Sequence, residues 1–149
     1  MRSLTLLFAI VPLALIAACT GVRPTNLGVK DGRLAPCPET PNCVSSQSSD
    51  AAHAIEPLRF SGNPTAAMAR LKTIIWGMPR TEIVSETDTY LHVEFTSLVF
   101  RFVDDVEFLL DEPDSCIQVR SASRMGRSDL GVNRKRIESI RSALPARDQ

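Results

Sequence analysis

The amino-acid sequence predicts an α+β domain with a mostly antiparallel sheet of about five strands and two helices on one face. Three observations lead to this prediction. Apolar residues recur at helical spacing in one segment near residue 70 and another near residue 140, apolar and polar residues alternate between residues 90 and 120, and the links between the alternating segments are short. Links of hairpin length join antiparallel neighbours, so both helices are free to pack on the same face. The expected order is strand, helix, four strands, helix.

The first two elements are predicted by an apolar run and by a helix start signal. Residues 53–60 form a plausible strand that Pro57 weakens. Asn63 followed by Pro64 is typical of a helix cap and first helical position. Apolar residues then recur at helical spacing, at Met68, Leu71, Ile75 and Met78, before Gly77 and Pro79 end the helix.

The strands and the last helix follow from periodicity. A half-buried strand is predicted where Leu91, Val93 and Phe95 alternate with His92 and Glu94. The next strand has its apolar residues on one parity, at Phe100, Phe102, Val106, Phe108 and Leu110. Residues 111–115 are a turn, and the strand after it contains Ile117 and Val119. The last helix has Ile137, Ile140 and Leu144 on one face and ends at Pro145.

Asp104 has the parity of the core residues in its strand, and an unpaired buried carboxylate is very unfavourable. Either a bulge shifts the register or Asp104 has a dedicated partner. The apolar residues of the two strands in the following hairpin must lie on the same face, which allows two registers. Arg120 lies opposite Asp105 in one register and opposite Glu107 in the other. In both registers Arg120 meets a carboxylate across the strand, as an ion pair that contributes about 0.2–1 kcal/mol if exposed.

The amino terminus has the features of a bacterial lipoprotein signal peptide, predicted over residues 1–18. Arg2 precedes the uncharged apolar stretch Leu4–Ile16, and Ile16-Ala17-Ala18-Cys19 resembles the lipobox, whose cysteine is acylated. The stretch is shorter than the roughly 20 residues of a transmembrane helix. We therefore expect Cys19 to carry lipid chains such as palmitate, with an ordinary secretory signal as the alternative. Thr20 is not the aspartate that retains lipoproteins at the inner membrane, which favours the outer membrane, facing the periplasm.

The segment between the lipid and the domain lacks large apolar residues. We expect residues 19–35 to be a lipidated flexible tether and residues 36–146 to form a single domain. Overall, 44% of the chain is apolar, and the net charge is +0 with 17 residues of each sign. A nucleic-acid partner is not expected, because such a protein would have a strong basic excess.

Three cysteines remain beside Cys19, in a compartment where disulfides persist. Cys37 and Cys43 bracket a short loop with two prolines, and we expect a disulfide between them. A zinc site of Cys37, Cys43 and His53 is the competing interpretation, but the spacing does not match the usual CxxC pairs. Cys116 is expected to be a buried or half-buried thiol rather than a nucleophile. No metal and no cofactor are predicted.

Charge is sorted along the second half of the chain. Six acidic and no basic residues lie in 104–114, whereas seven basic residues lie in 120–141. Complementary solvated faces explain this pattern most simply. The functional alternative is an anion site in the loop 124–129, where arginines lie beside a helix amino end.

Three motifs, in this order, together resemble the domain-of-unknown-function 1499 family. They are Leu34–Pro38 with Pro41–Ser46, then Phe100–Phe108, then Arg120–Arg124 continuing through Gly126, Asp129, Gly131, Asn133 and Arg136. The resemblance covers Leu34–Leu144 and implies a protein exported or membrane-associated in bacteria, with no established activity. Cys37, Asn42 and Cys43 also match the motifs. The resemblance favours one polar cluster formed by Asp104, Asp105, Arg120, Ser121, Ser123, Arg124, Asp129, Asn133 and Arg136.

Three functions fit these observations. We favour a non-catalytic envelope module that is anchored in the membrane through Cys19 and binds an envelope partner or small anion through residues 120–136. A structural lipoprotein without a ligand is the alternative. An enzyme is less favoured: a hydrolase using Asp104 or Asp105 with Ser121 or Ser123 would lack a histidine base near them.

Overall fold

The computed structural model describes residues 20–144. The expected signal peptide, Cys19, the helix stop at Pro145 and the domain end at residue 146 therefore lie outside the described residues. The elements, in chain order, are β1 (Cys43–Ser45), β2 (Leu58–Arg59), α1 (Pro64–Trp76), β3 (Thr81–Glu86), β4 (Tyr90–Thr96), β5 (Val103–Asp111), β6 (Cys116–Ser123) and α2 (Val132–Ala143).

The strands form one antiparallel sheet of six strands with the order β1-β6-β5-β4-β3. β2 also pairs with β6, beyond the end of β1. The predicted α+β class is therefore confirmed. The sheet has six strands rather than about five because the short β1 was not expected, and the strand predicted over 53–60 is reduced to β2, which begins directly after Pro57.

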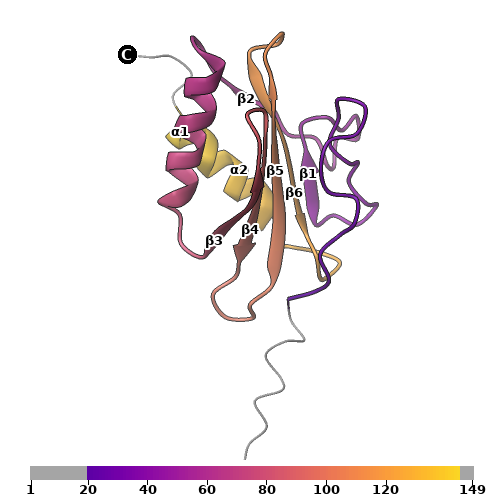
Figure 1. Cartoon of the computed structure of the whole chain (residues 1–149). Coiled ribbons are helices and arrows are strands. Elements are labelled where there is room, and N and C mark those ends of the chain that lie inside the picture. Colours follow the sequence, from indigo (N-terminus) through magenta and orange to yellow (C-terminus); the bar gives the residue numbers. More distant parts are fainter. Residues whose placement is uncertain (1–19, 145–149) are drawn as a thin grey trace, which may run out of the picture.

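Both helices lie on the same face of the sheet (Figure 1). α1 begins as predicted: Asn63 caps it by accepting a hydrogen bond from the Ala66 amide, and Pro64 occupies the first turn. Between the helices and the sheet lies the hydrophobic core. It includes Leu71 and Ile75 of α1, Ile137 and Ile140 of α2, and Val93, Val106, Phe108 and Val119 of the sheet.

The β5–β6 hairpin has the second of the two registers derived above. Glu107 lies opposite Arg120 and Phe108 opposite Val119. The predicted apolar parity holds from Asp104 to Leu110, but Phe100 and Phe102 do not belong to it and are 66% and 40% exposed. The reason is that β5 begins only at Val103, after a loop (residues 97–102) closed by hydrogen bonds between Ser97 and Phe102.

The second face of the sheet is also covered. Residues 20–36, which we call the N-terminal segment, lie against it: Arg23 pairs with Glu94, the Gly28 amide donates to Glu107, and Leu34 is buried. These contacts differ from the flexible tether expected over 19–35. They also explain why the side of β4 opposite the core is buried at His92 and half-buried at Tyr90 and Glu94 rather than open to solvent.

Candidate functional site

The side chains beneath the N-terminal segment are polar although they are buried or half-buried. Because side chains alternate along a strand, the residues between the core positions of the central strands all point to this face. We call this group the polar face. Its members are Tyr90, His92, Glu94, Asp105, Glu107 and Arg120, together with Arg124 just after β6.

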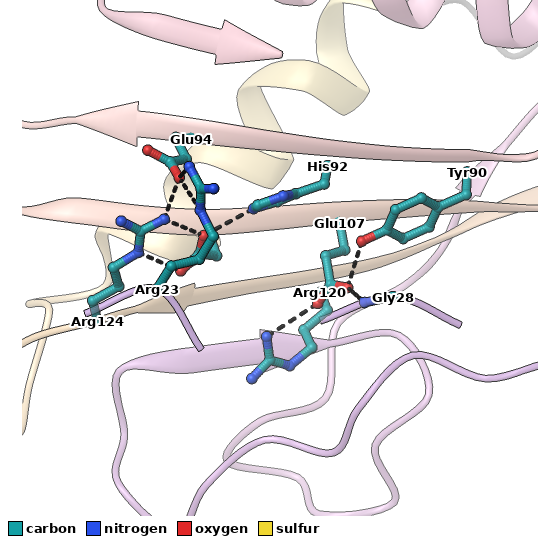
Figure 2. A network of polar contacts seen from close by, with 9 residues as sticks. Arg23, Gly28, Tyr90, His92, Glu94, Glu107, Arg120 and Arg124 are labelled. Carbon is teal, nitrogen blue, oxygen red and sulfur yellow. Dashed lines mark hydrogen bonds and ion pairs between the residues drawn. The ribbon is translucent and has the colours of Figure 1, made fainter. Parts of the chain in front are cut away.

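Asp105 is the centre of the first half of the polar face. One carboxylate oxygen accepts from His92 Nε2 at 2.8 Å and from Arg124 at 2.7 Å, and the other accepts from Arg124 Nε at 2.7 Å. Arg124 also binds Glu94, which in turn accepts from Arg23 of the N-terminal segment at 2.7 Å (Figure 2). Arg124 therefore links β4, β5 and the N-terminal segment through two carboxylates.

The protonation of these groups follows from their contacts. Burial by itself would raise the pKa of Asp105, but the hydrogen bonds from Arg124 and His92 outweigh it and hold that pKa below its usual value. Arg124 and Arg23 lower the pKa of Glu94 against burial in the same way. The hydrogen bonds to Asp105 raise the pKa of Arg124, so Arg124, Asp105 and Glu94 are all ionised at neutral pH.

Glu107 is the centre of the second half and is fully buried. One oxygen accepts from the Gly28 amide at 2.7 Å and from the Tyr90 hydroxyl at 2.8 Å, and the other from Arg120 at 3.2 Å (Figure 2). Burial and the nearby Glu107 charge raise the pKa of Tyr90 strongly, so its hydroxyl remains a donor. The Arg120–Glu107 pair is buried, so the small contribution to stability that was expected for an exposed ion pair does not apply to it.

His92, Glu94 and Asp105 offer a donor set that suits a metal ion. One ligand atom from each lies within 4.8 Å of the others, and histidine with carboxylates is a familiar zinc set. However, the Arg124 guanidinium binds both carboxylates. A metal ion would have to displace this buried cation, so the residues fit an ion-pair network better than a metal site.

The remaining predicted residues form a separate network on the opposite, helix-covered face. Asp104 has the dedicated partner that its parity required: Arg136 of α2 donates to it at 2.5 Å and lies 4.7 Å from the centre of the Phe95 ring. Arg136 also donates to Asn133 at 2.6 Å and to Ser121 at 3.1 Å. This network attaches α2 to β5 and β6.

Asn133 is buried at the start of α2 and ties the helix to two further segments. Its side chain donates to Ser123 Oγ and to the Asn42 carbonyl, each at 3.0 Å, and accepts from Ser121 at 2.5 Å. The Asn42 side chain in turn donates to the Gly126 carbonyl at 2.7 Å. The predicted polar residues thus form two networks separated by the sheet rather than one cluster, because successive residues such as Asp104 and Asp105 point to opposite faces.

The loop 124–129 is not arranged as an anion site. Arg124 is bound to carboxylates, and Asp129 places its own carboxylate at the start of α2, where it accepts from the Gly131 and Asn133 amides. An anion would meet that negative charge at the helix end. Arg127 is the exposed arginine of the loop.

The hydrolase interpretation also lacks the required geometry. Asp104 is buried against Arg136, while Ser121 and Ser123 are hydrogen-bonded to Asn133. The expectation that no histidine lies near these carboxylates is wrong for Asp105, because His92 Nε2 is 2.8 Å from it. However, His92 and Asp105 belong to the polar face, on the other side of the sheet from these serines. Burial, as the largest of several effects, raises the pKa of the Cys116 thiol, as expected for an inert buried thiol.

The predicted disulfide between Cys37 and Cys43 is present, with its α-carbons 5.7 Å apart. The two sulfurs are therefore not available as zinc ligands. His53, the third residue of that interpretation, has Nδ1 2.7 Å from Asp50 and Nε2 3.2 Å from the Thr40 carbonyl. A cavity of about 460 Å³ lies beside the disulfide and His53, but both ring nitrogens already have partners.

Sequence reasoning missed half of the polar face. Tyr90 was not singled out, His92 and Glu94 were assigned only to the polar side of a half-buried strand, and Glu107 was considered only as a partner of Arg120. Arg23 and Gly28 were assigned to the tether. His92 and Glu94 lie two residues apart on the same face of β4. A histidine next to a carboxylate in this position was a signal that this side is not plain solvent surface.

Comparison with known sequences identifies the family and no individual relative. Among residues 20–144 no helix has the length and apolar character needed to cross a membrane. No curated protein and no solved structure matches the chain significantly. The model of the family described as "Protein of unknown function (DUF1499)" matches residues 33–144, which include the disulfide and both polar networks except Arg23 and Gly28. The chain therefore belongs to the DUF1499 family.

Proposed function

We propose that the protein is a non-catalytic bacterial envelope lipoprotein whose domain is held close to the membrane by its N-terminal segment. One observation carries this proposal: the residues directly after Cys19 are bound to the sheet rather than extended away from it. Arg23 reaches the half-buried Glu94, and the Gly28 amide reaches the fully buried Glu107. A lipid on Cys19 would then restrain the whole domain.

The polar face has the properties of a structural network rather than of a binding pocket. Three carboxylates, Glu94, Asp105 and Glu107, are matched by three guanidiniums, those of Arg23, Arg120 and Arg124. Buried charges that are paired in this way hold segments in one arrangement, whereas a binding site leaves several donors or acceptors open to a ligand. On the polar face one such donor remains, because Arg120 Nε is buried without a hydrogen-bond partner. We therefore favour the structural alternative over anion binding through residues 120–136.

The proposed location is the outer membrane, facing the periplasm, if the source is Gram-negative. The apolar leader and the lipobox-like sequence before Cys19 support export and acylation, and Thr20 supports release from the inner membrane. The disulfide agrees with an oxidising compartment.

Acylation of Cys19 can be tested in cells that are fed a labelled fatty acid. We expect the wild-type chain to incorporate the label and to fractionate with membranes, and the Cys19→Ser variant to do neither. Cys116→Ser is the matched control and should be labelled like the wild type. An intact mass without acyl chains, or with the leader retained, would overturn the proposal.

A further inference from the structure

The exposed apolar side chains of the domain are concentrated at one end. Of the ten large apolar side chains that are exposed within residues 20–144, six lie in two neighbouring loops. We call this surface the apolar end; its members are Leu98, Val99, Phe100 and Phe102 of the β4–β5 loop and Met125 and Leu130 of the β6–α2 loop. Phe100 and Phe102 stack on each other, with ring centres 5.5 Å apart.

Contacts place the two loops and the start of the described chain together. The Arg124 amide donates a hydrogen bond to the Val103 carbonyl at 3.1 Å. Met125 directly follows Arg124, and Phe102 directly precedes Val103. Gly21 lies against Met125, because a β-carbon added at Gly21 would come within 3.0 Å of Met125 Cγ. Figure 1 shows both loops and the indigo start of the described chain at the same end of the molecule, opposite the β5–β6 turn.

The position of the chain start indicates what covers this surface. Thr20 directly follows Cys19, so a lipid on Cys19 would bring the apolar end to the bilayer; this step rests on the proposed function. Apolar loops next to a lipid anchor are typical of surfaces that enter the headgroup region.

The charges at the apolar end fit an anionic lipid surface. Arg101 and Arg127 are exposed within the two loops, and Arg80 is exposed beside them, with its Nε donating to the Thr96 carbonyl at 3.1 Å. Of the nearby acidic groups, Glu94 binds Arg23 and Arg124, and Asp129 binds the amides at the start of α2. Glu82, opposite Glu94, is exposed. The exposed arginines outnumber it, so the exposed charge is net cationic, which anionic headgroups attract.

We propose that the apolar end docks on the surface of an anionic bilayer, with the β4–β5 loop inserted into the boundary between headgroups and acyl chains. The domain would then have a fixed orientation on the membrane, with the β5–β6 turn pointing away from it.

The test places a single tryptophan at either end of the full-length protein. In a Trp76→Phe background, Phe100→Trp reports on the apolar end, and Glu112→Trp, in the exposed β5–β6 turn, is the matched control. Each protein is incorporated into vesicles of phosphatidylethanolamine and phosphatidylglycerol with brominated acyl chains. We expect fluorescence of Phe100→Trp to fall about twofold or more relative to non-brominated vesicles, and that of Glu112→Trp to stay unchanged. Adding Arg101→Glu and Arg127→Glu should reduce the quenching.

The mass of the same proteins separates this inference from the proposed function. An acylated chain without quenching of Phe100→Trp overturns docking on lipid and leaves the surface to a protein partner, while the proposed anchor stands. A chain without acylation that is still quenched when anionic vesicles are added overturns the anchor and supports the docking surface. A chain with neither property overturns both.

Discussion

At the scale of single residues, Glu107 is the side chain on which the second half of the polar face depends. It is fully buried, and its two oxygens accept from a backbone amide, a phenol and a guanidinium. A buried carboxylate with this many donors stabilises the fold only as long as all of them remain paired. Sequence alternation correctly assigned Glu107 to the face opposite the core, and the alternative register correctly paired it with Arg120.

Replacement of Glu107 by glutamine should therefore be strongly destabilising. The amide can still accept from Gly28 and Tyr90, but it leaves the buried Arg120 charge without a counter-charge. We expect the free energy of unfolding to fall by about 3 kcal/mol, measured by urea denaturation. Glu112→Gln, on the exposed turn, is the control and should change it by less than about 0.5 kcal/mol. Equal stability of the two variants would show that the Arg120–Glu107 pair is not needed.

The stability contributed by Arg124 should depend on pH. Asp105 and Glu94 have folded-state pKa values below their ordinary values, so their contribution is present above about pH 4 and is lost as pH falls through the folded-state pKa. Without Arg124, burial raises the pKa of Asp105 instead, which opposes folding while the carboxylate is ionised. We expect the stability deficit of Arg124→Ala to be large at pH 7 and to shrink below about pH 4.

Urea denaturation at a series of pH values, followed by circular dichroism, measures this deficit. Arg127→Ala removes an exposed arginine three residues away and should show almost no deficit at any pH. A deficit for Arg124→Ala that stays constant from pH 7 to pH 3 would mean that Arg124 acts through packing and not through the two carboxylates.

At the scale of elements, the sequence predicted α1, α2 and the strands β4, β5 and β6 because each has a strong local pattern, whereas β3 was expected only as one of four strands between the helices. Asn63 and Pro64 marked the start of α1, and Leu91, Val93 and Phe95 marked the core side of β4. β1 could not be predicted, because three residues carry no periodicity and β1 exists only through its pairing with β6. Phe100 and Phe102 were wrongly assigned to the core face of β5 for a related reason: they match its alternation although they lie in the loop before it.

The attachment of α2 to the sheet depends on a pair that joins two elements. Asp104 of β5 and Arg136 of α2 are each largely buried, so removal of either one leaves the other without its partner. We expect Asp104→Asn and Arg136→Met each to lower the free energy of unfolding by about 2–3 kcal/mol. The double variant should be less destabilised than the sum of the single variants, by at least about 1 kcal/mol.

A double-mutant cycle by urea denaturation measures this coupling. Glu138 and Arg141, an exposed pair within α2, provide the control cycle. Their coupling should be about 0.5 kcal/mol or less, because exposed pairs are weak. Additive effects of Asp104→Asn and Arg136→Met would show that the contact between β5 and α2 does not stabilise the domain.

At the scale of the whole molecule, the sequence did not predict that the N-terminal segment covers the face of the sheet opposite the helices. The N-terminal segment has few large apolar residues, which by composition favours a flexible tether. It is held instead by polar contacts between residues 71 and 79 positions apart, Arg23 with Glu94 and Gly28 with Glu107. Partners that distant leave no local pattern, and the two polar networks could be distinguished only once the sheet placed Asp104 and Asp105 on opposite faces.

Release of the N-terminal segment should detach residues 20–36 from the sheet without unfolding the domain. The Gly28 amide donates to Glu107 at a φ of 102°, a conformation that proline cannot adopt, and proline also lacks the donor. In Arg23→Ala/Gly28→Pro we expect fast hydrogen exchange throughout residues 20–36, whereas the amides of β5 and β6 stay protected. Val29→Ala, at an exposed neighbour, should exchange like the wild type.

If Cys19 carries the proposed lipid, that release would also change the distance between the membrane and the domain. Fully extended, a segment as long as residues 20–36 reaches roughly 55 Å, so a freed segment would let an acylated protein move tens of ångströms from the bilayer, whereas a bound segment keeps it within contact. Exchange in residues 20–36 that is already fast in the wild type would show that the segment is a tether after all. Loss of protection in β5 and β6 as well would show that the segment is an integral part of the fold, because its removal would then expose buried charges that the sheet cannot hold unpaired.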